Sequence, residues 1–203
     1  MYDKKFDNII LNIASGKIDP LNLKVIQENK KNSYFLVNVD INYENNNILQ
    51  NIEEEYNSNN DLHIKLYCRE DIFEFLDKTL IPFNYISMYR FLEHVSFTDV
   101  GYFIYQISKV IDRGGIVDCI VPDYKMLAEF ILEEKFEDIS SEKHNVYLTT
   151  ELLNDKGDPH QSIWTEDRLK YFWELEERFK IKSILNPFYF DGRPYIRAFI
   201  ERI

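Results

Sequence analysis

The stretch NIILNIASG at residues 8–16 sets the fold class of this chain. Its first six residues form a short apolar run, and Ala14, Ser15 and Gly16 follow as a loop signal. A short apolar run that ends at turn-forming residues is typical of a buried strand. A second run, YFLVNV at residues 34–39, ends at Asp40 in the same way. We therefore expect two buried strands, each entering a loop.

Strands and helices alternate along the rest of the chain. Further parallel strands are expected at residues 63–67, 85–88 and 116–121, the last after a turn at 113–115. Helices are expected at 71–77, from Ser96 or Thr98 to Ile111, from 123 onward, and from Thr165 to about Phe179. The last two strands, at 181–185 and 195–200, form an antiparallel hairpin. This order predicts an α/β fold: a single domain over residues 1–203 with a mostly parallel, seven-stranded, doubly wound sheet and a C-terminal antiparallel hairpin.

Composition and charge restrict the partners. The formal net charge of −11 repels phosphate backbones, so nucleic acid is not an expected partner. No apolar run approaches the roughly 20 residues that a membrane-spanning helix needs, and the N-terminus lacks a signal-peptide pattern. We expect a cytoplasmic protein in which Cys68 and Cys119 are free thiols in apolar surroundings. The sequence does not indicate an oligomeric state.

Candidate ligand-binding residues follow the strands. In an open parallel sheet, ligands bind outside the carboxyl ends of the strands. Gly16 would let the backbone approach a ligand closely, and Asp40 stands at roughly the 20-residue separation at which a carboxylate binds ribose hydroxyls. Asp71 follows the third strand. Each has an alternative role, because Gly16 can be an ordinary turn and either aspartate can be a helix N-cap.

Residues 90–95 follow the fourth strand and hold Glu93 and His94 side by side. The two side chains can act on a substrate, or they can form a structural hydrogen-bonded pair that holds the loop. His160 stands in a polar stretch and can simply be solvated. The histidines, cysteines and acids show no sequence spacing of a metal site, so no metal is expected.

Several segments, taken in order, resemble class I S-adenosylmethionine (SAM) dependent methyltransferases. They are LNIASGK at 11–17, NVDI at 38–41, FLEHV at 91–95, RGG at 113–115 followed by IVDCIVPDY at 116–124, and His160 with Trp164, Thr165 and Leu169. Each match alone is weakly specific, but together they keep the family order over nearly the whole chain. Within the family, the sequence most resembles a branch whose members carry N-V-D-I, L-E-H-V and V-P-D-Y segments.

The resemblance implies SAM as the cofactor and methyl transfer as the activity. The implied cofactor-binding residues are Ala14 and Gly16 at the methionine part, Asp40 and Ile41 at the ribose, Asp71 and Ile72 at the adenine, and Arg90 in the pocket. The implied catalytic residues are Glu93, His94 and His160. The acceptor, whether a small molecule, a sugar or a macromolecule, is not indicated.

Two positions depart from the family pattern. Position 14 is Ala where the family carries more glycine, and Asn84 stands where an aspartate is common. These departures support an alternative: a catalytically degenerate methyltransferase-fold protein that serves as a binding or assembly subunit. An NAD or nucleotide-sugar enzyme is a third option, against which the missing G-x-G-x-x-G counts.

Residues 123–163 exceed what the core elements require. This segment follows the fifth strand, so it leaves the sheet at the edge where the cofactor loops are expected. Its polar middle contains Gly157 and Pro159. We predict a lid insertion that covers the acceptor pocket and brings Tyr124 and His160 toward the transferable methyl. The alternative is a solvated excursion away from the site.

Overall fold

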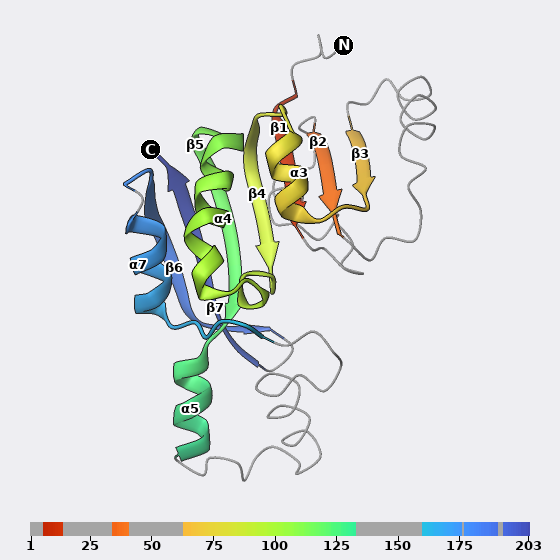
Figure 1. The fold of residues 1–203 in the computed structure, drawn as a ribbon. Coiled ribbons are helices and arrows are strands. Elements are labelled where there is room, and N and C mark those ends of the chain that lie inside the picture. The colour runs from red at the N-terminus through yellow and green to blue at the C-terminus, as the bar shows by residue number, and fades with distance from the viewer. Residues whose placement is uncertain (1–5, 14–33, 41–62, 133–159, 176, 191–192) are drawn as a thin grey trace.

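A computed structural model of the chain describes residues 6–13, 34–40, 63–132, 160–175, 177–190 and 193–203. These residues build one seven-stranded sheet with the order β3-β2-β1-β4-β5-β7-β6 (Figure 1). The strands are β1 (Asn8–Ile13), β2 (Tyr34–Val39), β3 (His63–Cys68), β4 (Phe83–Tyr89), β5 (Ile111–Pro122), β6 (Phe179–Phe190) and β7 (Arg193–Arg202). Strands β1 to β5 pair in parallel, and β7 pairs antiparallel with both β5 and β6. The predicted α/β fold class with its C-terminal antiparallel hairpin is confirmed.

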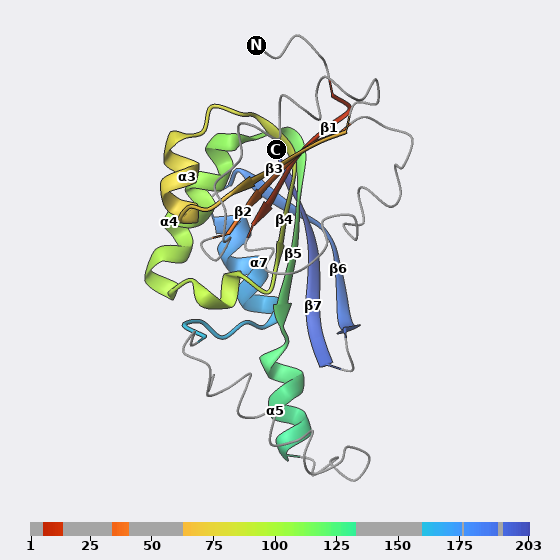
Figure 2. The same cartoon turned by 90° about the vertical axis from the view of Figure 1, so that its right-hand side faces the viewer.

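Helices cover one face of this sheet in the described part of the chain. They are α3 (Ile72–Lys78), α4 (Phe97–Val110) and α7 (Glu166–Leu175), and Figure 2 shows all three on the same side of the strands. The short 3-10 helix η2 (Leu92–His94) precedes α4. Helix α5 (Tyr124–Leu132) instead continues from the end of β5 beyond the sheet (Figure 1). None of the described helices is both long and apolar enough to span a bilayer.

Alternate strand residues and the inner helix faces form the main core. The inner face of α4 carries Val100, Phe103, Ile104, Ile107 and Val110, which are all buried. They pack in one cluster with strand residues such as Leu11, Val37 and Val117 and with Trp173 of α7. Full burial of each such side chain is worth about 1.5–3 kcal/mol, so this helix-covered face stabilises the described part of the fold strongly.

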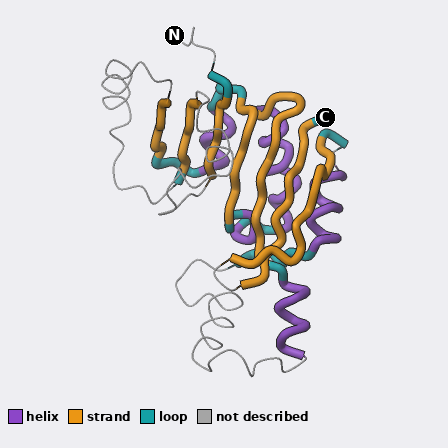
Figure 3. The backbone as a smooth tube through the Cα atoms, turned by 180° about the vertical axis from the view of Figure 1, so that it is seen from behind, coloured by secondary structure: helices purple, strands orange, loops and turns teal. Residues whose placement is uncertain are grey.

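The other face of the sheet is nearest the viewer in Figure 3. This face carries a row of buried polar side chains across neighbouring strands. Asn12 in β1 donates to Asn38 Oδ1 in β2 at 2.9 Å, and Ser87 in β4 donates to Asn12 Oδ1 at 2.7 Å. All three are register partners and are buried. A slip of one residue would break these bonds and move the side chains to the apolar face, so the row fixes the strand register.

Two predicted boundaries were wrong. Helix α7 ends at Leu175 rather than near Phe179, and Phe179 instead begins β6, where it pairs with Arg202. Glu177 adopts a positive φ of 50°, a left-handed conformation that cannot continue a helix. Because the side chain of Phe179 is buried in either case, the aromatic pattern alone could not distinguish helix from strand.

The hairpin strands are also longer than predicted, because β6 continues through Pro187. Proline is tolerated there because β6 is the edge strand, and its pairing shifts register between Leu185 and Phe188.

The predicted turn at residues 113–115 lies within β5 as an interruption of its pairing. The β4 partners move from Phe83–Ile111 to Tyr85–Ile116, so residues 112–115 loop out between them. Gly114 has a φ of +78°, and a Cβ on Gly115 would lie 2.7 Å from the Ile111 side chain. Both positions therefore require glycine, as the turn prediction assumed.

Asn84 has a structural role that an aspartate could not fill. Its Oδ1 accepts from the Ile9 amide at 2.8 Å, and its Nδ2 donates to the Asp7 carbonyl at 2.9 Å. The side chain thus joins the start of β4 to the start of β1, on the opposite edge from the carboxyl ends. A carboxylate has no donor for the Asp7 carbonyl. An aspartate here would keep the bond from the Ile9 amide and lose the one to the Asp7 carbonyl.

Candidate functional site

The carboxyl ends of β1, β2, β3 and β4 meet at one edge of the sheet (Figure 1). Asp40 lies at this edge directly after β2. Its amide donates to the Cys68 carbonyl at 3.0 Å, and only 8% of the residue is exposed. The backbone at Asp40 is therefore held against β3, and the position of its carboxylate is determined by the sheet rather than by a loop. The other candidates at this end of β1 and β2, Ala14, Gly16 and Ile41, lie outside the described residues.

Asp71 is the N-cap of α3. It has extended backbone angles, and its Oδ1 accepts from the amides of Phe73 at 2.9 Å and Glu74 at 3.3 Å. The N-cap alternative is thus confirmed, whereas a contact with adenine stays a prediction. Ile72 is buried in the main core with Phe75 and Leu76.

Arg90 directly follows β4 and adopts a left-handed conformation with a φ of 58°. Such a conformation costs a non-glycine residue roughly 1–2 kcal/mol. The Arg90 amide donates to the Ile120 carbonyl of β5 at 2.8 Å, and its guanidinium lies 6.0 Å from the ring centre of Tyr195 in β7. The side chain is therefore directed toward the β5 and β7 side of the edge, two strands away from β1. Strained backbone is often found at functional turns, which keeps Arg90 among the candidates.

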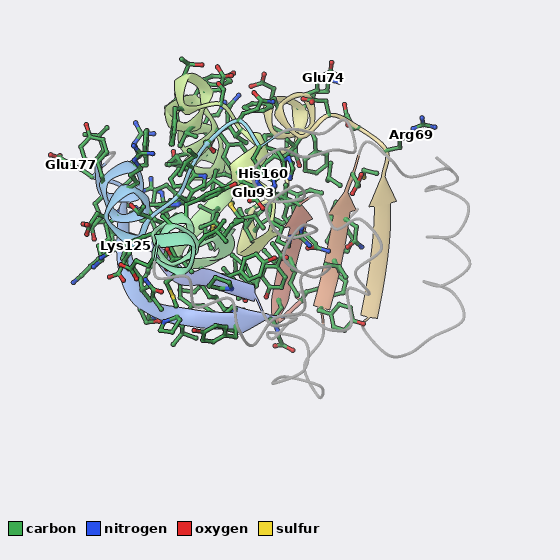
Figure 4. The ribbon with its side chains drawn as sticks, turned by 90° about the horizontal axis from the view of Figure 1, so that it is seen from below. Arg69, Glu74, Glu93, Lys125, His160 and Glu177 are labelled. Carbon is green, nitrogen blue, oxygen red and sulfur yellow. The ribbon has the colours of Figure 1, made fainter. Side chains whose placement is uncertain are left out.

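Glu93, His94 and His160 come together beyond the end of β4. Figure 4, which views the molecule from below and so from the carboxyl edge, shows Glu93 and His160 next to each other. One ligating atom from each of the three side chains lies within 4.8 Å of the others. Glu93 is completely buried, while His94 and His160 are half-buried. The sequence separates His160 from the other two residues, so their meeting results from the fold.

Backbone hydrogen bonds hold this cluster together. The Glu93 carbonyl accepts from the amides of Gln161 at 2.7 Å and Ser162 at 3.0 Å. The Ser162 hydroxyl donates to the Leu92 carbonyl at 3.0 Å and accepts from the indole of Trp164 at 2.8 Å. Trp164 is fully buried in the main core. Residues 160–164 are therefore fixed against η2 by contacts deep in the protein.

Tyr124 completes the surroundings of His160. Its hydroxyl is hydrogen-bonded to His160 Nδ1, and its amide donates to the Trp164 carbonyl at 3.2 Å. The His94 and His160 rings meet edge to face with centroids 4.8 Å apart. The two ends of the predicted lid insertion thus lie beside Glu93 and His94. Its middle, residues 133–159, is outside the described residues, so the lid stays a prediction.

The sequence analysis missed a second buried cluster, around Asp118 in β5. Asp118 accepts from the hydroxyls of Tyr85 and Tyr89, each at 2.6 Å, and from two nitrogens of Arg197 at 2.9 and 2.6 Å. Its side chain is inaccessible, and that of Arg197 is 13% exposed. The sequence does contain a signal for this cluster: Asp118 lies inside the apolar run IVDCIV, and Arg197 lies inside YIRAFI. A charged side chain in a buried strand needs a partner of opposite charge, so the two could have been expected to pair.

Electrostatics explain the pKa shifts around Asp118. Burial raises the pKa values of the Tyr85 and Tyr89 hydroxyls, and the negative charge of Asp118 raises them further. Burial alone would lower the pKa of Arg197, but its hydrogen bonds and attraction to Asp118 outweigh this and raise it. The neighbouring Cys119 is a free, buried thiol whose pKa is raised by burial and then by Glu93 and Asp118. Burial also raises the pKa of Cys68, so both thiols remain protonated at neutral pH.

Solved structures with a fold similar to that of this chain include two methyltransferases. An archaeal protein from Methanosarcina mazei, solved as a SAM-dependent methyltransferase, has a TM-score of 0.53 at 16% identity, over 98% of this chain and 93% of its own. Magnesium protoporphyrin IX methyltransferase from Synechocystis PCC 6803 was solved with SAH, the demethylated product of SAM. Its TM-score is 0.57 at 11% identity, and the match covers 97% of this chain and 74% of the Synechocystis protein. The chain has a Rossmann-like methyltransferase fold. At these identities the likeness shows the fold alone.

The methyltransferase fold also occurs in larger proteins similar to this chain. A cyclopropane synthase from Mycobacterium tuberculosis has a TM-score of 0.54 at 9% identity, and the match covers 88% of this chain but only 57% of the synthase. The chain thus spans little more than half the length of that protein. No protein-family model matches the sequence, and no curated protein matches it.

Proposed function

We propose that this chain is a SAM-dependent methyltransferase. Its cofactor would lie at the carboxyl ends of β1, β2 and β3, and its acceptor would lie beside Glu93, His94 and His160. The main support is the position of Asp40, a buried carboxylate held at the end of β2 in a methyltransferase fold. Solved neighbours of this fold contain SAM or SAH. The family resemblance of residues 11–17 and 38–41 agrees with this position.

The chemistry requires little from the protein beyond placement. Methyl transfer is an in-line displacement at an activated sulfonium carbon, so the protein must hold the acceptor in line and, for a poor nucleophile, remove a proton. In our proposal Asp40 binds the ribose hydroxyls with Ile41 beside it, and Ala14 and Gly16 contact the methionine part of the cofactor. Asp71, Ile72 and Arg90 line the rest of the pocket.

Proton removal is assigned to the cluster beyond β4. His94 and His160 are half-buried imidazoles, and the unprotonated nitrogen of an imidazole can accept a proton from an acceptor within hydrogen-bond reach. Tyr124, hydrogen-bonded to His160 Nδ1, would orient that ring with Nε2 available to an acceptor. Residues 123–163 would close over the acceptor.

Calorimetric titration with SAH tests the cofactor assignment. The parent chain should bind SAH, and Asp40→Ala should weaken binding by about 1–3 kcal/mol because charge-assisted hydrogen bonds to the ribose are lost. Asp167→Asn, at an exposed carboxylate of α7, is the matched control and should bind like the parent. Absence of binding at millimolar SAH, or equal binding by the Asp40 variant, would overturn the assignment. Binding without methyl transfer to any acceptor would instead favour the catalytically degenerate alternative.

A further inference from the structure

The cluster of Glu93, His94 and His160 has the donor atoms of a metal site. One oxygen of a carboxylate and one nitrogen from each of two imidazoles lie within 4.8 Å of one another. Ligand atoms around a tetrahedral zinc ion are roughly 3.3–3.5 Å apart, given bonds of about 2.0–2.2 Å. Small rotations of these side chains would bring the donors to that separation.

The donor types select the class of ion. Two histidines and one glutamate form the ligand set of several catalytic zinc sites, in which the fourth position stays open for water or substrate. The same set suits other divalent transition metals, whereas magnesium and calcium prefer oxygen ligands alone. We propose that Glu93, His94 and His160 bind a divalent transition-metal ion of the zinc type. This inference does not depend on SAM binding.

The backbone contacts described above fix two of the three ligands relative to each other. The Glu93 carbonyl is bonded to the amides of Gln161 and Ser162, which places His160, one residue earlier, opposite η2. Ser162 and the buried Trp164 secure the same segment. The two backbone segments are thus held together before an ion arrives and only side chains have to adjust, which lowers the entropy cost of binding.

Tyr124 supplies the support that a metal-bound histidine usually has. Histidine ligands commonly use their second ring nitrogen in a hydrogen bond, which sets the ring orientation and the tautomer. The Tyr124 hydroxyl is bonded to His160 Nδ1, which leaves Nε2 as the coordinating nitrogen. The edge-to-face contact with His94 holds the ring from another side.

Burial and access also fit an ion. Glu93 is completely buried, so an ion bound to its carboxylate would be largely removed from bulk water, and the attraction between opposite charges is stronger there than at the surface. The two histidines are half-buried and give an ion a route from solvent. With an ion bound, His160 Nε2 would be a ligand and no longer a base, and the ion would assist deprotonation instead by lowering the pKa of a coordinated water, hydroxyl or thiol.

Titration with Co²⁺, whose visible absorption reports nitrogen and oxygen coordination, tests the site directly in the full chain. We expect one tight equivalent of Co²⁺, displaced by Zn²⁺. E93Q and H160N should each lower the affinity by 100-fold or more, and Y124F by about tenfold, within the range known for supporting residues. E177Q, at an exposed glutamate before β6, is the matched carboxylate control and should bind like the parent.

Three results would overturn the metal site. They are the absence of a stoichiometric Co²⁺ spectrum in the parent, a spectrum that E93Q and H160N both retain, and equal loss in E177Q. If the buried E93Q variant fails to fold, judged by circular dichroism, H160N decides alone because His160 is half-buried. Asp40→Ala should bind Co²⁺ normally whatever it does to SAH, so failure of the cofactor assignment and failure of the metal site are distinguishable.

Discussion

Two fully buried carboxylates in this protein have opposite surroundings. Asp118, in the middle of β5, accepts hydrogen bonds from two tyrosines and from a nearly buried arginine. Glu93, beyond the end of β4, lies among two half-buried imidazoles. The first carboxylate is neutralised by a guanidinium whose charge does not vary with pH. The second faces groups that exchange protons and can bind ligands.

This difference distinguishes a buried polar cluster with a structural role from one with a proposed functional role. The Asp118 cluster joins β4, β5 and β7, the place where the sheet changes from parallel to antiparallel pairing. Its hydrogen bonds are all within the sheet. The Glu93 cluster lies at the edge where ligands of parallel sheets bind. We infer that the interior cluster specifies the sheet and that the edge cluster serves chemistry.

Removal of the interior carboxylate should have the largest effect on stability. Asp118→Asn would leave the Arg197 guanidinium buried without its counter-charge, which typically costs 3–5 kcal/mol. Glu93→Gln, the matched change at the edge, keeps the size and shape of a side chain that lies beside two imidazoles, so it should cost no more than about 1–2 kcal/mol, the scale of one altered hydrogen bond. Urea denaturation of both variants measures the difference. Equal losses would contradict the division into structural and functional clusters.

The second-largest effect is expected at high pH, where the Asp118 cluster should stabilise the protein less. Burial and then the charge of Asp118 raise the folded-state pKa of Tyr85 and Tyr89 above the ordinary value of 10.0. A raised pKa means that the folded state holds the proton more tightly, so the resulting stability is fully present below pH 10 and is lost as pH rises above it.

Tyr85→Phe and Tyr89→Phe test this pH dependence. Each should cost about 1.5–3 kcal/mol at neutral pH, as expected for a hydrogen bond to a charged group. Each should also reduce the fall in stability between pH 9 and 11, measured by urea denaturation at each pH. Tyr171→Phe, at an exposed residue of α7, is the control. A parent protein whose stability does not fall above pH 10 would contradict the assignment.

The sequence predicted the elements of the fold better than their partners across the sheet. Apolar runs such as NIILNI and YFLVNV define buried strands by local pattern, and both were confirmed at the predicted residues. The end of α7 was wrong because a left-handed residue at Glu177, not a proline or glycine, precedes the next strand.

The positions of candidate site residues could be predicted only where neighbouring residues in the sequence determine them. Asp40 at a strand end and Asp71 at a helix start follow from neighbouring residues, whereas the meeting of His160 with Glu93 depends on hydrogen bonds between distant segments. The metal-site proposal could not arise from sequence spacing for the same reason. Nor does the Asp118–Arg197 pair, separated by most of the C-terminal half, follow from a local pattern.

An aspartate at the edge can have both a structural and a functional role, and Asp71 allows the two to be separated. Asp71→Ala removes the acceptor for the Phe73 and Glu74 amides and should cost about 1 kcal/mol of stability, the usual loss for an N-cap.

Asp71→Ser provides the separation, because serine caps a helix as well as aspartate but is shorter and uncharged. The serine variant should therefore keep the parent's stability in urea denaturation. Its affinity for SAH, measured by calorimetry, then reports the second role alone. Weaker SAH binding with unchanged stability would assign Asp71 to the cofactor as well as to α3. Unchanged binding would restrict Asp71 to capping and place it, although it lies at the edge, with the structural carboxylates represented by Asp118.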